Sequence, residues 1–356
     1  MTVHPRLRPV VESMPTYRPG PKVAAPSGEM FLLGANESPD GPLPPVAAAI
    51  AAAAAGANRY PDYASTELVN TLADTLGVPA AQVAVGCGSV GVVGNLLSAA
   101  AEPGGQVVYA WRSFEAYPTL TRLAGMSPVP VPLRDDRHDL TAMAAAVTDQ
   151  TRAVLVCNPN NPTGTVVHRR ELESFLDDLP PEVLVLLDEA YVEYVRDRES
   201  PDGLDLLAGR PSLAVVRTFS KAYGLAGLRV GYAVADERVA RAARTTGLSF
   251  AVNRIAQAAA VASLRAGDEL TARVETTVKE VGRVRSALLD LGLPVPASEG
   301  NFVWLGLGAD TAAFTSACAA AGVAVRAFPG EGVRVSIGDT RANNAFLAAA
   351  WEYTHS

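Results

Sequence analysis

The sequence predicts an α/β fold in which helices cover both faces of a mostly parallel sheet. Three observations lead to this prediction. Continuous apolar runs of strand length alternate with helical patterns such as 169–179. Each run is followed by a polar or glycine-bearing turn. The length of 356 residues exceeds one average domain and suggests two.

The first 28 residues are rich in proline and glycine and are expected to form an extended arm. A larger domain is then expected over residues 29–253, with a helix from the GCGSVG string to about Ala101. The apolar runs that should form its sheet are Gln82–Val85, Gln106–Ala110, Ala153–Cys157, Val183–Leu187 and Leu213–Val216.

The character of the sequence changes near residue 254, which predicts a smaller α+β domain over residues 254–356. A long helical segment with a break near Gly267 comes first. The other elements expected there are strands at Asn301–Leu305, Val323–Arg326 and Val333–Ile337, and a closing helix from about Arg341.

Composition excludes several classes of function. The net charge is −7 and charges of both signs are interspersed, which argues against nucleic acid or a membrane surface as partner. The cysteines (Cys87, Cys157, Cys318) lie far apart and form no CxxC pair, so no metal site is expected. The N-terminus lacks the apolar core of a signal peptide, and the expected location is the cytoplasm.

Lysine is rare in this chain. Of its 30 basic residues 27 are arginine, and only Lys22, Lys221 and Lys279 are lysine. Lysine can be deprotonated in a suitable environment, whereas arginine cannot, so any amine chemistry must use one of these three. Lys22 lies in the arm and Lys279 in an Arg/Glu-rich helix. Lys221 follows an apolar strand and is flanked by aromatics and glycines, which makes it the functional candidate.

Ligands of open α/β sheets bind beyond the carboxyl ends of the strands, so the residues at those ends are considered together. The string Gly86–Gly91 is a literal GxGxxG that opens a helix, a place where backbone amides can bind a phosphate. A dinucleotide site would need an acidic residue about 20 positions later, and none is present. A tight turn without ligand is equally compatible with this loop.

Further polar groups end the other strands. Asp188 ends an apolar run and needs a cation, either an arginine or the protonated ring nitrogen of a bound heterocycle. The 158–164 loop, NPNNPTG, projects asparagine side chains or is only a turn. Thr218, Ser220 and Arg229 lie near Lys221 and suit a phosphate. Together an imine-forming amine, an acid and a phosphate cradle are what pyridoxal phosphate requires.

At this point the sequence resembles a known family. NRYPD, NPNNPTG, LLDEAYVEY and TFSKAYGLAGLRVGY occur in the order of the fold-type I pyridoxal-phosphate aminotransferases, and the likeness runs from about Tyr17 to the C-terminus. It is similar to the histidinol-phosphate aminotransferase-like branch and, within it, most like the aromatic amino acid (phenylalanine) type. The resemblance implies a seven-stranded, mostly parallel sheet between helices, a homodimer with shared active sites, and amino acid and 2-oxo acid substrates.

The resemblance also implies a role for each matching residue. Lys221 would hold the cofactor as a Schiff base and then move a proton, and Asp188 would pair with the ring nitrogen. Tyr60 would reach the phosphate of the neighbouring subunit, or is only an aromatic in a turn. The remaining expected contacts are Asn161 and Tyr191 with the ring oxygen, Phe114 with the ring face, Ser89, Val90, Thr218, Ser220 and Arg229 with the phosphate, and Tyr17, Asn161, Arg326 and Arg334 with the substrate.

The expected reaction is transfer of the amino group of phenylalanine, tyrosine or tryptophan to 2-oxoglutarate by a ping-pong mechanism. Val90 and Gly91 replace acidic residues that many histidinol-phosphate enzymes carry, and Trp111-Arg112 replaces a smaller stretch, which suits an apolar side chain. Histidinol phosphate stays open as the alternative donor, because Arg326 and Arg334 suit its phosphate as well. Arg326 is otherwise a solvent-facing strand residue. Decarboxylation on the same scaffold is a further alternative.

Overall fold

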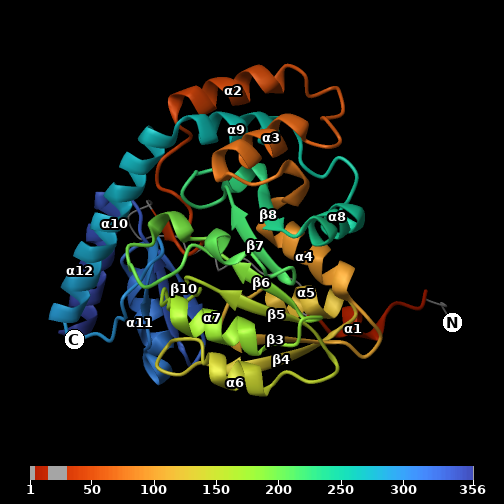
Figure 1. Ribbon diagram of the computed structural model, residues 1–356. Helices are drawn as coiled ribbons and strands as arrows, with labels where there is room; N and C mark the ends of the chain where they lie inside the picture. Colours follow the sequence, from red (N-terminus) through yellow and green to blue (C-terminus); the bar gives the residue numbers. More distant parts are fainter. Residues whose placement is uncertain (1–4, 15–29, 356) are drawn as a thin grey trace.

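The computed structural model describes residues 5–14 and 30–355 and has the predicted α/β architecture (Figure 1). In this part of the chain seven strands form the larger sheet, in the order β2-β8-β7-β6-β5-β3-β4. Their bounds are β2 Val83–Gly86, β3 Gln106–Trp111, β4 Ser127–Pro132, β5 Thr151–Cys157, β6 Leu184–Asp188, β7 Leu213–Thr218 and β8 Gly231–Ala235.

The predicted apolar runs all became strands of this sheet, and β3, β4, β5, β6 and β7 pair in parallel. Two strands were not predicted. β8 runs antiparallel between β2 and β7. β4 contains three prolines, which cannot donate to a sheet ladder, and it lies at the edge of the sheet, where prolines are tolerated.

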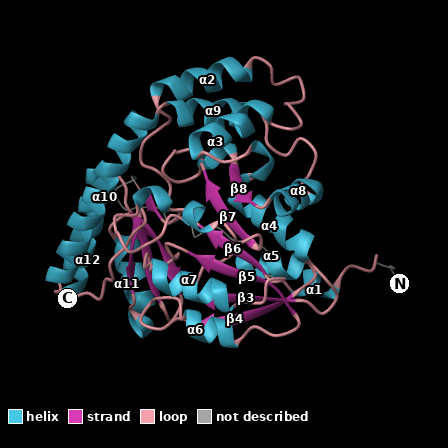
Figure 2. Cartoon of the chain, viewed as in Figure 1, coloured by secondary structure: helices cyan, strands magenta, loops and turns pink. Residues whose placement is uncertain are grey.

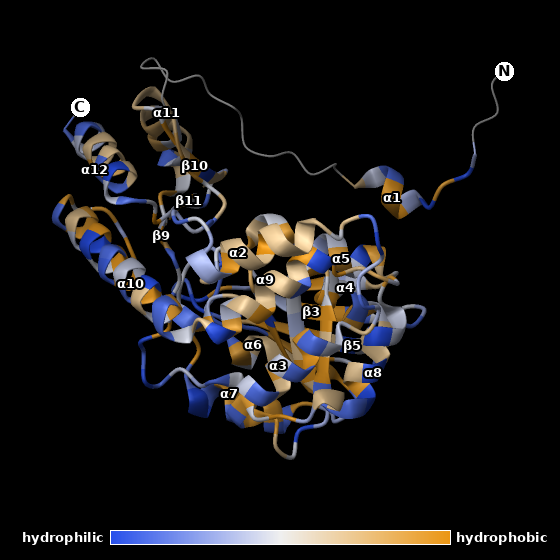
Figure 3. Cartoon of the chain, turned by 90° about the horizontal axis from the view of Figure 1, so that it is seen from above, coloured by the Kyte–Doolittle hydropathy of each residue, from blue (hydrophilic) through white to orange (hydrophobic). Residues whose placement is uncertain are grey.

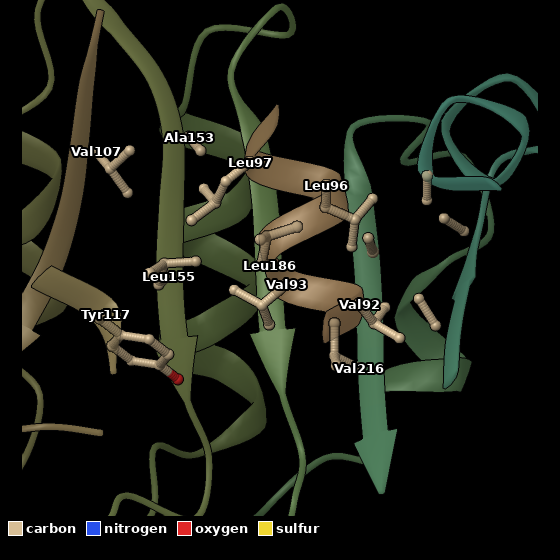
Figure 4. Packing of buried hydrophobic residues seen from close by; sticks show 14 of the residues in the cluster. Val92, Val93, Leu96, Leu97, Val107, Tyr117, Ala153, Leu155, Leu186 and Val216 are labelled. Atoms are coloured by element: carbon tan, nitrogen blue, oxygen red, sulfur yellow. The ribbon is translucent and has the colours of Figure 1, made fainter. Parts of the chain in front are cut away.

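Helices cover both faces of the larger sheet (Figure 2). One face packs against α4 (Gly88–Ala100), α5 (Tyr117–Leu123) and α8 (Glu237–Thr246), and the other against α6 (Leu140–Ala145) and α7 (Arg169–Asp178). Figure 4 shows the valines and leucines of α4 packed onto the strands, with Tyr117 of α5 near their carboxyl ends. Val92, Val93, Leu96 and Leu97 share one side of α4, so they become fully buried.

A further group of helices packs over the β2 and β8 end of the sheet. It consists of α2 (Pro44–Ala54), α3 (Thr66–Leu76) and α9 (Arg254–Arg265), whose apolar sides meet Phe219, Tyr232 and Val234. Asn253 caps the first turn of α9 by accepting a hydrogen bond from the amide of Ala256. The long helical segment breaks where predicted, since α9 ends at Arg265 and α10 begins at Gly267.

The smaller sheet has four strands in the order β1-β10-β11-β9, among the residues described. They are β1 (Phe31–Leu33), β9 (Phe302–Leu305), β10 (Val323–Phe328) and β11 (Gly332–Ser336), packed against α10 (Gly267–Asp290), α11 (Thr311–Ala320) and α12 (Thr340–Thr354). Seen from above, these helices stand apart from the larger sheet (Figure 3). The division at residues 28 and 253 stays a prediction, and β1 belongs to the smaller sheet although it lies in the range assigned to the larger domain.

The remaining elements are short. They are the helix α1 (Pro9–Ser13) and the 3-10 turns η1 (Ala80–Gln82), η2 (Val192–Tyr194), η3 (Gly203–Leu206), η4 (Ala226–Leu228) and η5 (Gly308–Asp310). α10 joins the two parts of the molecule, because Leu270 and Val274 pack on Tyr191 and Tyr194 of the larger part. None of the helices in the described ranges combines the length and apolar character needed to cross a lipid bilayer.

Candidate active site

Lys221 lies directly beyond the carboxyl end of β7, as expected from its position after an apolar run. Its ammonium Nζ donates hydrogen bonds to the carbonyl oxygens of Ala35 (3.0 Å) and Asn36 (3.2 Å), which follow β1. Burial, and after it the positive charge of Arg334, lowers the pKa of Lys221 to about 7. A substantial fraction of this amine is therefore uncharged and nucleophilic near neutral pH.

Asp188 is the last residue of β6 and is only 4% exposed. Its Oδ2 accepts a hydrogen bond from the hydroxyl of Tyr117 at 2.8 Å. Its Oδ1 is buried and has no hydrogen-bond partner in the described part of the chain. Burial raises the pKa of Asp188 to about 6, against the hydrogen bond from Tyr117. A cationic hydrogen-bond donor placed at Oδ1 would supply the hydrogen bond that this buried carboxylate lacks.

The arginine that the sequence left open as a partner for Asp188 pairs with the next residue instead. Arg217 donates to Oε2 of Glu189 through Nε (2.9 Å) and Nη2 (2.7 Å), and both side chains are buried. Glu189 also accepts the amide of Gly203, and Arg217 also contacts Asp202. No ion pair of Asp188 with an arginine is found between residues 30 and 355, so Asp188 keeps its open side for another partner.

Asn161 and Tyr191 lie in the same region. Tyr191 is buried, its hydroxyl accepts a hydrogen bond from Nδ2 of Asn36 at 2.9 Å, and Nζ of Lys221 is 5.9 Å from its ring centre. Burial raises the pKa of Tyr191 to about 12, so the phenol is a hydrogen-bond donor at neutral pH. Asn161 accepts a hydrogen bond from Nη1 of Arg334 at 2.5 Å, so the two predicted substrate ligands contact each other.

Arg334 reaches this region from β11 of the smaller sheet. It is buried, and its Nη2 donates to the carbonyl of Gly34 at 2.6 Å. The guanidinium thus lies beside the segment that contacts Lys221, and its charge is among the causes of the low pKa of that lysine. The structure brings together Lys221, Asn161, Tyr191 and Arg334, which lie far apart in the sequence.

The candidate phosphate cradle lies at the first turn of α4. Gly88 has φ +71°, and a Cβ built there would lie 2.5 Å from Nη2 of Arg229. A Cβ at Gly231 would lie 2.4 Å from the amide nitrogen of Ser89. Gly88 therefore requires glycine because of its positive φ, and Gly231 requires it because the backbone of Gly88 and Ser89 passes close to it.

The other predicted phosphate ligands surround this turn. Nη1 of Arg229 donates to Oγ of Ser220 at 3.3 Å, and the amide of Ser220 donates to Oγ1 of Thr218 at 3.1 Å. Arg229 itself adopts φ +58°, a strained conformation for an arginine, which directs its side chain back to Gly88. A helix N-terminus, two hydroxyls and a guanidinium form a site for a dianion.

The loop that carries Phe114 is held to the loop that carries Asn161. Oδ1 of Asn160 accepts the hydroxyl of Ser113 at 2.8 Å and lies 3.1 Å from Nε2 of His138, and Nδ2 of Asn160 donates to the carbonyl of Arg112. Phe114 is half-buried and its ring packs edge-on against Tyr117. The same tyrosine that contacts Asp188 therefore fixes the predicted ring-stacking residue.

The other three predicted residues lie at the edge of this centre, away from it, or outside the described ranges. Arg326 of β10 is paired with Glu115, so it is not a simple solvent-facing arginine. Tyr60 is 77% exposed and stacks on Phe250, with ring centres 4.6 Å apart. Tyr17 lies outside the described residues.

Sequence reasoning missed two contributors to the site. Asn36 is fully buried and connects Tyr191 with Ser336 through hydrogen bonds. Tyr117 supplies the only hydrogen bond that Asp188 receives from a described side chain. A signal existed for Tyr117, because a buried carboxylate requires a donor and this tyrosine begins the helix after the predicted Phe114. Asn36 gave no comparable signal, since only tertiary structure brings it to Tyr191.

The residues present fit pyridoxal phosphate. The unsatisfied Oδ1 of Asp188 suits a protonated ring nitrogen, and the glycine-dependent cradle at α4 suits the phosphate. The lowered pKa of Lys221 suits an amine that reacts with an aldehyde. All three lie at the carboxyl ends of the strands β6 and β7 and at the helix that follows β2, which is where α/β sheets bind ligands.

Comparisons with known proteins agree with this fit. The family model described as aminotransferase class I and II matches residues 28–350. An aromatic amino acid aminotransferase of Thermobifida fusca is 60% identical over 349 residues, covering 98% of this chain and 97% of the relative. One of Streptomyces coelicolor is 55% identical over 350 residues and covers 98% of each chain.

A solved structure gives the same result at the level of the fold. The crystal structure of histidinol-phosphate aminotransferase from Sinorhizobium meliloti in complex with pyridoxal-5'-phosphate has a TM-score of 0.90 and 31% identity. The match covers 99% of this chain and 98% of that chain. The predicted fold type is confirmed by this neighbour. The sequence, the fold and the family model together show that this chain belongs to the aminotransferase class I and II family.

Proposed function

We propose that this aminotransferase uses pyridoxal phosphate to transfer the amino group of an aromatic amino acid to 2-oxoglutarate. The observation that carries the chemistry is the presence, at one edge of the sheet, of two groups. They are the amine of Lys221, with its lowered pKa, and the buried acid Asp188, whose Oδ1 has no hydrogen-bond partner among the described residues. The names of the relatives at 50–60% identity, all aromatic amino acid aminotransferases, support the substrate class. The cytoplasm stays the expected compartment.

Pyridoxal phosphate, when bound, supplies an aldehyde for the amino group and a ring that withdraws electrons from the substrate α-carbon. Lys221 would hold the aldehyde and, once released, move a proton between the α-carbon and the cofactor. Its pKa of about 7 suits both directions of transfer, since neither protonation state is strongly favoured at neutral pH. Asp188 would keep the ring nitrogen protonated through its open oxygen.

The remaining polar residues would hold the cofactor in place. Ser89 and Val90 would donate backbone amides to the phosphate at the first turn of α4, and Thr218, Ser220 and Arg229 would complete its coordination. Asn161 and Tyr191 would hydrogen-bond the phenolic oxygen of the ring. Phe114 would cover one face of the ring, in the position fixed by its contact with Tyr117.

Arg334 would bind the α-carboxylate of the substrate. Its buried guanidinium is held by Asn161 and by the carbonyl of Gly34, and bidentate pairing with a carboxylate is the strong mode for arginine. Asn161 would contact the substrate through this arginine. Arg326 would lie on the side-chain end of the substrate pocket, and Tyr17 stays a predicted part of its cover.

The active form would be a homodimer. Four large apolar residues, Tyr60, Tyr63, Leu248 and Phe250, are exposed together in the single chain, and Phe250 contacts both tyrosines. Exposed apolar groups of this size gather at protein interfaces. Tyr60 would reach the phosphate of the neighbouring subunit. Sedimentation of Phe250→Glu checks this assignment, because a charge in the interface should shift the protein towards monomer.

A histidinol-phosphate donor is the second candidate, favoured by the TM-score of 0.90 to an enzyme of that name. The two readings share the chemistry and differ in the occupant of the side-chain pocket. The purified holoenzyme should be offered phenylalanine, tyrosine, tryptophan, histidinol phosphate, aspartate and leucine one at a time, and the loss of cofactor absorbance followed. If histidinol phosphate converts the cofactor fastest, it is the preferred amino donor and the proposal of an aromatic donor is wrong.

Lys221→Ala tests the mechanism itself. The variant should lose turnover and the visible absorbance band together, because no other described lysine lies near the site. Lys279→Ala, on the exposed side of α10, is the matched control and should keep both. Full activity in Lys221→Ala would contradict the proposed role.

A further inference from the structure

Two ion pairs connect the segment between β3 and α5 to the β10–β11 ribbon of the smaller sheet. Glu115 binds Arg326 in a bidentate manner, with Oε1 2.7 Å from Nη2 and Oε2 3.2 Å from Nε. Nearby, Arg112 binds Glu331, with its Nε 2.8 Å from Oε2. The two pairs have opposite polarity, since the larger part supplies the acid in one and the base in the other.

The pairs differ in their position relative to Arg334. Arg326 of β10 lies directly opposite Arg334 of β11 in the antiparallel register, so the two side chains share one face of the ribbon. Cβ atoms of such residues are about 4.5–5.5 Å apart. Glu331 instead lies in the turn between the two strands. The carboxylate of Glu115 is thus held beside the proposed site of the substrate α-carboxylate.

We propose that Glu115 determines substrate specificity. Its carboxylate occupies the position on Arg326 where a second carboxylate of the substrate would bind. A dicarboxylic 2-oxo acid would displace Glu115 and bind Arg326 through its distal carboxylate. An aromatic substrate would leave the Glu115–Arg326 pair closed. This inference rests on the proposed function and explains how one pocket accepts an apolar side chain and a charged one in turn.

The surroundings of the pair suit both occupants. The centre of the Phe328 ring lies 6.0 Å from the guanidinium carbons of both Arg326 and Arg334, so an apolar surface lies near both cations. An aromatic ring placed there would meet an arginine whose charge is balanced by the carboxylate of Glu115. Displacement of Glu115 is inexpensive, because its side chain is 39% exposed and can return to water.

The test compares two unreactive acids, glutarate and 3-phenylpropanoate, by titration calorimetry on the full-length holoenzyme. Glu115→Gln removes the competing charge, so glutarate should bind about two- to fivefold more tightly, the range expected for a partly exposed ion pair. Binding of 3-phenylpropanoate should be unchanged or weaker, because the ring then meets a guanidinium whose charge Glu115 no longer balances. Arg326→Gln should weaken glutarate, and Glu115→Gln should have no further effect in that background.

Glu331→Gln is the matched control, since it breaks the sister pair between the same two segments. It should shift both acids by the same factor. If Glu115→Gln also shifts both acids equally, or shifts neither, Glu115 is only a contact between the two parts of the molecule and the inference is wrong. Because glutarate and 3-phenylpropanoate do not react, this outcome is independent of the donor panel that tests the proposed function.

Discussion

Asp188 and Glu189 are adjacent carboxylates at the end of one strand, and their surroundings are opposite. Glu189 points to the side where Arg217 and the amide of Gly203 satisfy it. Asp188 points to the side of Lys221 and Tyr117 and keeps one buried oxygen without a partner among the described residues. Both are less than 5% exposed.

The difference between the two carboxylates separates structure from chemistry. A buried charge whose hydrogen bonds are complete holds the fold together, and a buried charge with an open position indicates a missing ligand. The side of the sheet that carries Glu189 has a structural role, and the side that carries Asp188 is the proposed place for the cofactor. Substitutions at the two positions should therefore affect different quantities.

The largest effect is expected for Asp188→Asn. The amide cannot keep the ring nitrogen protonated, so turnover should fall by roughly 10²–10³-fold or more, the scale of losing one electrostatic contact at a reacting centre. The measurement is the rate of the phenylalanine half-reaction under single-turnover conditions, with Asp188→Glu as the conservative comparison. Turnover within threefold of the parent enzyme would contradict the role of the open oxygen.

Glu189→Gln should mainly change stability. The substitution leaves Arg217 buried with a weakened partner, and breaking such a pair costs about 3 kcal/mol or more of unfolding free energy. Urea unfolding at equal protein concentration measures this loss. The double variant Glu189→Gln, Arg217→Met should recover most of it, because no uncompensated charge then remains. If Glu189→Gln reduced the single-turnover rate as strongly as Asp188→Asn does, Glu189 would not be a purely structural residue.

The pH dependence of cofactor-free protein sharpens the contrast. The folded pKa of Asp188 is raised to about 6 from an ordinary value near 4, so its contribution to stability is present at low pH and is lost as pH rises through 6. Asp188→Asn removes this loss and should be more stable than the parent protein above pH 6, by about 3 kcal/mol. Below pH 4 the two should unfold alike. Denaturant midpoints at pH 4 and pH 7.5 test the sign.

Tyr117→Phe should give the smallest effect of the series. It removes the hydrogen bond that Asp188 receives from the Tyr117 hydroxyl, which costs about 1–2 kcal/mol of stability. The loss raises the pKa of Asp188, because that bond favours the carboxylate. The pH profile of the half-reaction should shift upward on its acidic side. Tyr109→Phe, which removes a hydroxyl from a neighbouring buried ring, is the control and should leave the profile in place.

The sequence was sufficient for the fold where apolar pattern and burial coincide. The central strands β5, β6 and β7 are continuous apolar runs because both faces are covered, and all were predicted. β4 was missed because alternating prolines are unusual in strands, and its edge position explains them. β1 has only three residues, and its partner β10 lies far along the chain, so no local pattern could indicate it.

The site was predictable where its chemistry requires a particular residue at a strand end. Lys221 and Asp188 stood out because an amine and an acid are expensive after apolar runs. Asn36 and Glu115 could not be predicted, because their importance lies in the partners that folding brings to them, Tyr191 and Arg326.

The pairing of β1 with β10 limits how far the chain can fold while it is being synthesised on the ribosome. Phe31 pairs with Val323, so the partner strand is synthesised about 290 residues later, which at bacterial or eukaryotic elongation rates takes about 15–60 s. During that interval the carbonyls of Ala35 and Asn36 have no fixed position from which to receive Lys221. A nascent chain can thus complete its central sheet early, but it acquires a working amine only after nearly the whole polypeptide has emerged.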